Sequence, residues 1–154
     1  NFYPSSSTSE ICIELDIQDQ INKGYTISAK TLSFWLQQNT KAKKVFNADN
    51  TEVPKLKIKE ALTQFTIWLG LGNNVNIWGN GAMFDNTILC NAYDKENLYC
   101  PWSYKNDKCY KTIKNMFLNI PFKPSDIPHN ALRDAKAQAS HLIKIHEYVE
   151  SLNK

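Results

Sequence analysis

A histidine and a carboxylate stand five positions apart where a C-terminal helix is predicted to begin. Pro128 and the helix start hold His129 on a loop, and Asp134 follows about one turn into the helix. An imidazole titrates near neutrality and can take a proton, whereas carboxylate oxygens bind Mg²⁺ or Mn²⁺. The pair therefore fits hydrolysis by metal-bound water, with His129 as general base. Considered singly, an exposed loop histidine and an aspartate on a helix surface are the simpler interpretations.

A second cluster, WGNGAMFDN over residues 78–86, combines glycines with a carboxylate. Glycine lets the backbone approach a ligand closely, and Asp85 stands at the predicted start of a helix, where the backbone favours anions. On its own, Asp85 is more simply a helix cap or a partner of the helix dipole. If both clusters belong to one site, Asp85, His129 and Asp134 converge on one cleft, with the two carboxylates within about 8 Å of each other.

Four side chains beside these clusters are candidates for contact with a substrate: Trp35, Asn80, Phe84 and Asn130. Phe84 or Trp35 can stack on a terminal base, because stacking tolerates any base sequence. Packing in the core is the alternative for both rings. The two asparagines offer amide groups that can donate and accept hydrogen bonds.

The elements that position these residues belong to a chain of ordinary globular composition. Its 154 residues fit a single domain over residues 1–154, and 42% hydrophobic residues suffice for a core. Arg133 is the single arginine among 18 basic residues, so forked guanidinium clamps are nearly absent. No apolar run approaches the roughly 20 residues that span a bilayer, and the N-terminus lacks a signal-peptide pattern. We therefore expect a cytoplasmic protein without membrane contact.

Hydrophobic periodicity predicts an alternation of helices and strands. A period-two pattern in ICIELDI, residues 11–17, predicts a half-buried strand, and helices are predicted after Ser28 and from Ile58 to the glycine at 70. The other predicted elements are a basic loop over 41–54, a strand over 75–78, a helix from about residue 84, a short segment over 99–104, a helix capped by Asp107, a proline-rich loop over 121–128 and a final helix over 131–152. Strand, glycine turn and helix at 75–95 form an α/β unit.

Several further groups are predicted to be structural. The buried stripe of the final helix is expected to hold Leu132, Ala135, Ala139, Leu142, Ile143, His146 and Val149. His141 and His146 are both interpreted as structural rather than ligating. The four cysteines are spaced too far apart for C-x-x-C zinc pairs and are expected to be reduced thiols, although an even count permits disulfides.

Three segments in order, WGNGAMFDNTIL, PWSYKNDKCYKTI and HNALRDAKAQA, resemble the second motif, the linking segment and the third motif of the DEDDh 3′-to-5′ exonucleases. TISAKTLSFWLQQ also resembles the T-x-x-W-W helix of the RNase T-like branch, with Phe34-Trp35 in place of the tryptophan pair. That branch contains compact bacterial and phage exoribonucleases. The similarity covers most of the chain, from residue 11 to residue 149.

The resemblance implies an α/β, RNase H-like fold with a mixed central sheet flanked by helices. It also implies removal of nucleotides from the 3′ ends of single-stranded or 3′-overhanging RNA or DNA. In this family four acidic residues bind two Mg²⁺ or Mn²⁺ ions and a histidine is the general base. Asp85 matches the second-motif aspartate, His129 the base and Asp134 the third-motif aspartate. Asp107 is expected to cap a helix or, alternatively, to contact the metal ligands, and a homodimer is a further expectation.

One part of the family pattern is missing. The Asp-x-Glu of the first motif has no counterpart, because no such tripeptide precedes Asp85. The chain is therefore expected to lack the first strands of the domain and two of the four metal-binding carboxylates. Glu14 and Asp16 offer the reverse order on one strand face, but their segment aligns better with the residues before the T-x-x-W-W helix. We expect weak metal binding and very slow digestion of 3′ ends.

The missing motif favours a second function class, a catalytically defective relative that binds nucleic acid or a protein partner through the same groove. Retention of Asp85, His129 and Asp134 favours the exonuclease. A plain α/β domain with incidental motifs would require three accidental matches. RNA and DNA both remain open as substrates, because no motif specifies contact with a 2′-hydroxyl group.

Overall fold

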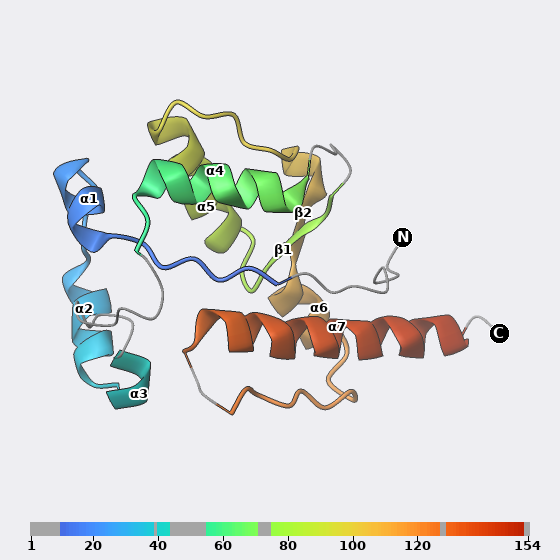
Figure 1. Ribbon diagram of the computed structural model, residues 1–154. Helices are drawn as coiled ribbons and strands as arrows, with labels where there is room; N and C mark the ends of the chain where they lie inside the picture. The colour runs from blue at the N-terminus through green and yellow to red at the C-terminus, as the bar shows by residue number, and fades with distance from the viewer. Residues whose placement is uncertain (1–9, 39, 44–54, 71–74, 127–128, 153–154) are drawn as a thin grey trace.

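The computed structural model describes residues 10–38, 40–43, 55–70, 75–126 and 129–152. Its elements are α1 (Ile17–Asn22), α2 (Ala29–Leu36), α3 (Thr40–Lys43), α4 (Ile58–Leu69), β1 (Ile77–Gly79), α5 (Asp85–Lys95), the 3-10 turn η2 (Tyr104–Asn106), β2 (Asp107–Cys109), α6 (Tyr110–Met116) and α7 (Ala131–Leu152). Helices α1, α2 and α3 follow one another along one edge of the molecule, and α7 runs beneath α4 and the strands (Figure 1). Among the described residues, no helix is long and apolar enough to cross a membrane.

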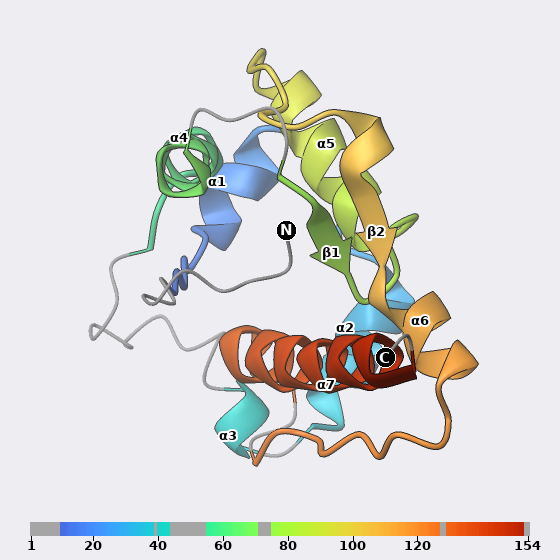
Figure 2. The same ribbon diagram turned by 90° about the vertical axis from the view of Figure 1, so that its right-hand side faces the viewer.

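Strands β1 and β2 pair in parallel, with Ile77 opposite Asp107 and Gly79 opposite Cys109. Parallel neighbours need a crossover connection, and α5 supplies it on one side of the pair (Figure 2). A second, isolated parallel pairing joins Leu15 to Leu56. The chain is therefore α/β, as predicted, and its helices around a small parallel sheet are consistent with a compact RNase H-like exonuclease fold.

The main core lies where α4 meets α5. Its buried residues are Ile58, Leu62, Ala92, Tyr93 and Trp102. Leu62 follows Ile58 by one helical turn, so both lie on the same face of α4. The Tyr93 hydroxyl is satisfied inside this core, because it donates to the Leu62 carbonyl and shares a hydrogen bond with Thr66 Oγ1. Gly70, at φ +82°, follows the last residue of α4 as predicted.

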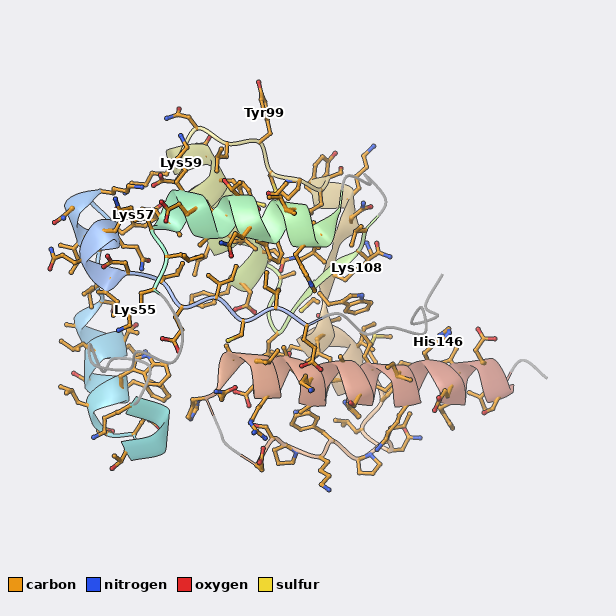
Figure 3. All side chains as sticks on the ribbon, in the orientation of Figure 1. Lys55, Lys57, Lys59, Tyr99, Lys108 and His146 are labelled. Carbon is orange, nitrogen blue, oxygen red and sulfur yellow. The ribbon has the colours of Figure 1, made fainter. Side chains whose placement is uncertain are left out.

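The segment that leads into α4 alternates apolar residues with lysines. Leu56 pairs with Leu15, and Ile58 is 5% exposed, whereas Lys57 and Lys59 are exposed. Figure 3 shows Lys55, Lys57 and Lys59 along this edge of the molecule. The alternation therefore buries one face of the segment and lines the other with positive charge.

Helix α7 packs on α6 through a buried histidine. The Tyr110 hydroxyl and His141 Nδ1 lie 2.8 Å apart, and His141 Nε2 is 2.9 Å from the Ile120 carbonyl oxygen. His141 is 3% exposed, and both of its ring nitrogens are hydrogen-bonded. Its predicted structural role is confirmed.

The apolar stripe of α7 is rotated from the predicted one. Leu142 is buried as expected, together with His141 and Ile145, whereas Ala135 and Ala139 are exposed. Helix α7 packs on α6 around His141. The buried face of α7 is therefore centred on His141 and not on the predicted apolar stripe.

The predicted strand over residues 11–17 is largely wrong. Within that segment the strand pairing is confined to Leu15. Asp16 instead caps α1, because its carboxylate accepts hydrogen bonds from the Gln18 and Asp19 amides. Side-chain capping of the next residues ends the extended chain before a full strand can pair.

The predicted helix cap at Asp107 is also wrong. Asp107 opens β2, and α6 begins later, at Tyr110. The predicted loop at 41–54 begins with α3, which ends at Lys43, and residues 44–54 lie outside the described residues. The four cysteines are free thiols, as expected.

Candidate active site

The first turn of α7 ties its own entry loop together. Asn130 Oδ1 accepts a hydrogen bond from the Arg133 amide, which makes Asn130 the N-cap of the helix. Asp134 Oδ2 accepts from the His129 amide at 3.0 Å, and its Oδ1 accepts from the Ser125 hydroxyl. The structure thus brings His129 and Asp134 together, as predicted, although the bond uses the main chain of His129.

The imidazole of His129 faces two aromatic rings of α2. Its ring centre lies 5.2 Å from that of Phe34 and 6.0 Å from that of Trp35, and each pair meets edge to face. Ser28 caps α2 by accepting a hydrogen bond from the Thr31 amide, as the sequence predicts. Since Phe34 is 44% exposed and His129 is also exposed, the cluster is open to solvent on part of its surface.

Phe34 is the residue that sequence reasoning undervalued. The sequence marks Phe34 only as one half of the Phe-Trp pair, and Trp35 is the member of that pair that we expect to contact substrate. The edge-to-face contact of Phe34 with His129 is the closer of the two. The T-x-x-W-W resemblance was the available signal, because it marks both aromatic positions.

His129 has a left-handed backbone, with φ +65°. A non-glycine residue adopts this conformation at a cost, and the Asp134 carboxylate that binds its amide holds it there. A groove of about 450 Å³ borders this turn and is lined by Glu10, Ser125, Asp126, Leu132, Arg133 and Lys136. Ser125 joins the groove to Asp134, because its hydroxyl donates to that carboxylate.

Asp85 stands at the start of α5, as predicted, and its carboxylate turns back on the glycine loop. Oδ2 accepts a hydrogen bond from the Gly81 amide at 2.8 Å. The side chain therefore closes the turn between β1 and α5 and lies in the first turn of the helix, where a negative charge is favourable. Its convergence with His129 and Asp134 on one cleft stays a prediction.

The other candidates in this loop lie at the surface. Phe84 is 69% exposed, so packing in the core does not account for it. Asn80 is exposed, and its carbonyl accepts a hydrogen bond from the Lys111 amide at the start of α6. The loop before α5 is thereby attached to the segment that follows β2.

A buried hydrogen-bond triad, Asn86, Asp107 and Trp102, fixes the start of α5 against the sheet. Asp107 Oδ1 accepts from Asn86 Nδ2 at 2.8 Å and from Trp102 Nε1 at 2.9 Å. Asn86 Nδ2 also donates to the Ile77 carbonyl of β1. Asn86 and Trp102 are 3% and 5% exposed. Their N–H groups are shielded from water, and Asp107 satisfies them in its place. Asp107 therefore positions the helix that carries Asp85.

Gly79 is required beside this triad because no side chain fits there. A Cβ on Gly79 would lie 2.5 Å from Asn86 Oδ1 and 3.1 Å from Asp85 Cβ. The first glycine of the WGNG run is thus explained by the close approach of α5 to the end of β1.

The described residues do not form a site for two metal ions. Within residues 10–38, 40–43, 55–70, 75–126 and 129–152, no three His, Cys, Asp or Glu side chains are grouped so that they could hold a metal ion. Asp85 and Asp134 supply oxygen ligands of the right chemical type, but both carboxylates are engaged in local hydrogen bonds. The oxygen ligands of Asp85 and Asp134 are of the type that Mg²⁺ or Mn²⁺ prefers.

The arrangement at α2 and α7 is suited to holding an unpaired nucleotide end. The exposed Phe34 and the partly exposed Trp35 are aromatic rings on which a base can stack, and an imidazole stands beside them. The pKa of the Cys109 thiol, near the Asn80 carbonyl, is lowered by hydrogen bonds from the Thr112 side chain and from backbone amides.

No curated protein and no solved structure matches the chain.

The family model of the Rv2179c-like 3′-5′ exoribonuclease domain matches residues 6–146. The match includes both motif clusters and the Phe-Trp pair of α2. Its family indicates a hydrolytic nuclease with a nucleic-acid substrate. The chain belongs to the family of Rv2179c-like 3′-5′ exoribonuclease domains.

Proposed function

We propose that this chain is a 3′-to-5′ exonuclease of the DEDDh type, close to the RNase T-like branch. Its substrate is a single-stranded or 3′-overhanging RNA, and DNA is the alternative nucleic acid. One observation carries the proposal: the imidazole of His129 stands against Phe34 and Trp35, while its main chain is held by Asp134. Two aromatic rings that can stack on a base thus lie next to an imidazole that can accept a proton.

In this proposal the terminal base stacks on Phe34, which is 44% exposed, on the partly exposed Trp35, or on the exposed Phe84. Stacking holds a base without reading its identity, so the enzyme can act on any sequence. The Asn80 and Asn130 amides bind phosphate or sugar oxygens. His129 then takes the proton of the attacking water, because an imidazole accepts a proton at neutral pH.

Asp85 and Asp134 are the proposed ligands of Mg²⁺ or Mn²⁺. Such an ion, when bound, activates water and stabilises the departing oxygen. Both carboxylates already orient backbone, since Asp85 binds the Gly81 amide and Asp134 binds the His129 amide. Each carboxylate keeps free acceptor sites for an ion, so the expected weak metal binding and slow turnover rest on the small number of proposed ligands.

A second candidate function is a catalytically defective relative that binds nucleic acid through the same surface. One observation favours it: the described residues group no three potential metal ligands. Binding would use the aromatic cluster and not the carboxylates. A homodimer is a further proposal, and it rests on the family resemblance.

The test uses a 5′-labelled single-stranded RNA incubated with Mn²⁺. The exonuclease proposal expects a ladder of products shortened from the 3′ end, and His129→Ala should abolish it. His146→Ala is the matched control, because His146 lies on α7 toward its C-terminal end, whereas His129 precedes the start of that helix (Figure 3). RNA that is bound but not shortened, with affinity lost in Phe34→Ala, would identify the binding module.

A further inference from the structure

Two cysteines lie in contact beneath the surface between α5 and the loop that follows it. Cys90 Sγ and Cys100 Sγ are 3.3 Å apart, and both are free thiols. Each residue is half-buried and packs against the core cluster of α4 and α5. A disulfide needs its sulfurs at about 2.05 Å, so an approach of about 1.3 Å would suffice.

The approach of the two thiols is fixed by the fold of the intervening chain. After α5 ends at Lys95, Asn97 adopts a left-handed φ of +54°, and the Leu98 amide donates to the Tyr93 carbonyl. This turn reverses the chain and returns Cys100 to the side of α5. The backbone turn after α5 therefore places the two sulfurs next to each other.

The partly buried environment of the pair changes the acidity of Cys90. Burial raises the pKa of the Cys90 thiol to about 12, and the hydrogen bond with Cys100 adds to the shift. Either sulfur can donate its S–H to the other. Cys100 follows Tyr99, which is 98% exposed and points away from the molecule (Figure 3). Cys90 and Cys100 are themselves only partly buried, so a small oxidant can reach the pair.

We propose that Cys90 and Cys100 are a thiol modification site, which a peroxide oxidises to an intramolecular disulfide. Cys100 loses its thiol proton to solvent, its sulfur attacks a peroxide oxygen and breaks the O–O bond, and the departing oxygen takes a proton from solvent, which gives a sulfenic acid and one water or alcohol. The Cys90 sulfur then attacks the sulfenic sulfur, its proton leaves with the hydroxyl group, and a second water forms. Both sulfurs are oxidised and the peroxide is reduced, so atoms and electrons balance.

This bond would fasten α5, which carries Asp85 and Asn86, to the segment that carries Trp102 and Asp107, the partners of Asn86 in the triad. Cys90 lies on α5 one turn beyond Asn86, and Cys100 lies two residues before Trp102. The disulfide closes the loop of residues 90–100, and short loops of this kind stabilise a domain by restricting its unfolded chain. We expect the melting temperature to rise by about 5 °C on oxidation. The inference stands independently of the exonuclease proposal.

The experiment exposes the full chain to hydrogen peroxide, blocks remaining thiols with an alkylating reagent and digests it with trypsin. Lys95 lies between the two cysteines, so a disulfide links two separate tryptic peptides, which end at Lys95 and at Lys105. The expected product is this linked pair, two hydrogens lighter than its reduced parts and separated by dithiothreitol. Cys12 and Cys109 should not appear in linked peptides.

The matched variants are Cys90→Ser and Cys109→Ser. Cys90→Ser should lose both the linked peptide and the rise in melting temperature, whereas Cys109→Ser should keep both. Alkylated Cys90 and Cys100 after peroxide treatment would overturn the proposal. A linkage of Cys100 to Cys12 or Cys109 would overturn it as well.

Discussion

Replacing Asp107 with alanine tests whether the buried triad holds the start of α5. The change removes the acceptor of two hydrogen bonds, from Asn86 Nδ2 and from Trp102 Nε1. Asn86 keeps its bond to the Ile77 carbonyl, whereas the indole N–H of the buried Trp102 loses its partner. An unsatisfied buried donor costs about 1 to 3 kcal/mol, and hydrogen bonds to a carboxylate contribute about 1.5 to 3 kcal/mol each. We expect Asp107→Ala to lower the free energy of unfolding by about 3 kcal/mol.

At about 2 to 4 °C per kcal/mol for a domain of this size, the melting temperature should fall by about 9 °C. Thermal unfolding followed by circular dichroism measures the shift. Asp107→Asn should melt between the unmodified chain and Asp107→Ala, because its amide oxygen can accept both hydrogen bonds but lacks the carboxylate charge that strengthens them. Asp94→Ala is the control, since Asp94 is exposed on α5, the helix that the triad holds. Equal melting temperatures for Asp107→Ala and Asp94→Ala would refute the role given to the triad.

Three further predictions concern the site and its supports. Gly79→Ala should unfold at lower temperature and weaken RNA binding, because its Cβ would meet Asn86 Oδ1 at 2.5 Å; unchanged melting would contradict the close approach of α5. The hydrogen bond to Glu96 raises the pKa of Lys23 above 10.5, so the stabilisation from this ion pair is present at neutral pH and is lost as the pH rises above 10.5. The difference in melting temperature between the unmodified chain and Lys23→Gln should therefore vanish at high pH, and a constant difference would rule out the ion pair as its source. Phe34→Ala should weaken binding of a fluorescent single-stranded RNA about tenfold, since stacking contributes about 1 to 3 kcal/mol per base, and an equal effect of Tyr99→Ala would show that the loss is not specific to the aromatic cluster.

The elements that local pattern determines were predicted well. Ile58 and Leu62 lie one turn apart on an apolar face, and Gly70 stops the helix, so α4 follows from its own residues. The predicted strand around Leu15 needed a partner that the sequence does not identify, and capping by Asp16 converts the next residues to helix. Asp107 precedes a helix in the sequence, but residues 107–109 form strand β2 because they pair with the distant β1. The helix therefore begins only at Tyr110.

The candidate site shows the same division between local and distant contacts. The spacing of His129 and Asp134 was sufficient to place them in one turn of chain, and a hydrogen bond joins them. The contact of Phe34 with His129 joins α2 to the entry of α7, far apart in the sequence, and the family resemblance marked the Phe-Trp pair without indicating this contact. No periodicity predicts such a contact, because it depends on how α2 and α7 meet. Convergence of Asp85 with this pair likewise depends on tertiary packing.

The measurement closest to the central claim is the release of nucleotide from a 3′-labelled single-stranded RNA in the presence of Mn²⁺. The unmodified chain, Asp134→Asn and Asp134→Ala are compared, because asparagine can still accept the hydrogen bond from the His129 amide. The proposed function predicts slow release of the labelled terminal nucleotide by the unmodified chain and its loss in both variants, while Asp134→Asn keeps the fold. Release at the same rate by Asp134→Asn, or cleavage inside the strand with the 3′ end intact, would contradict it.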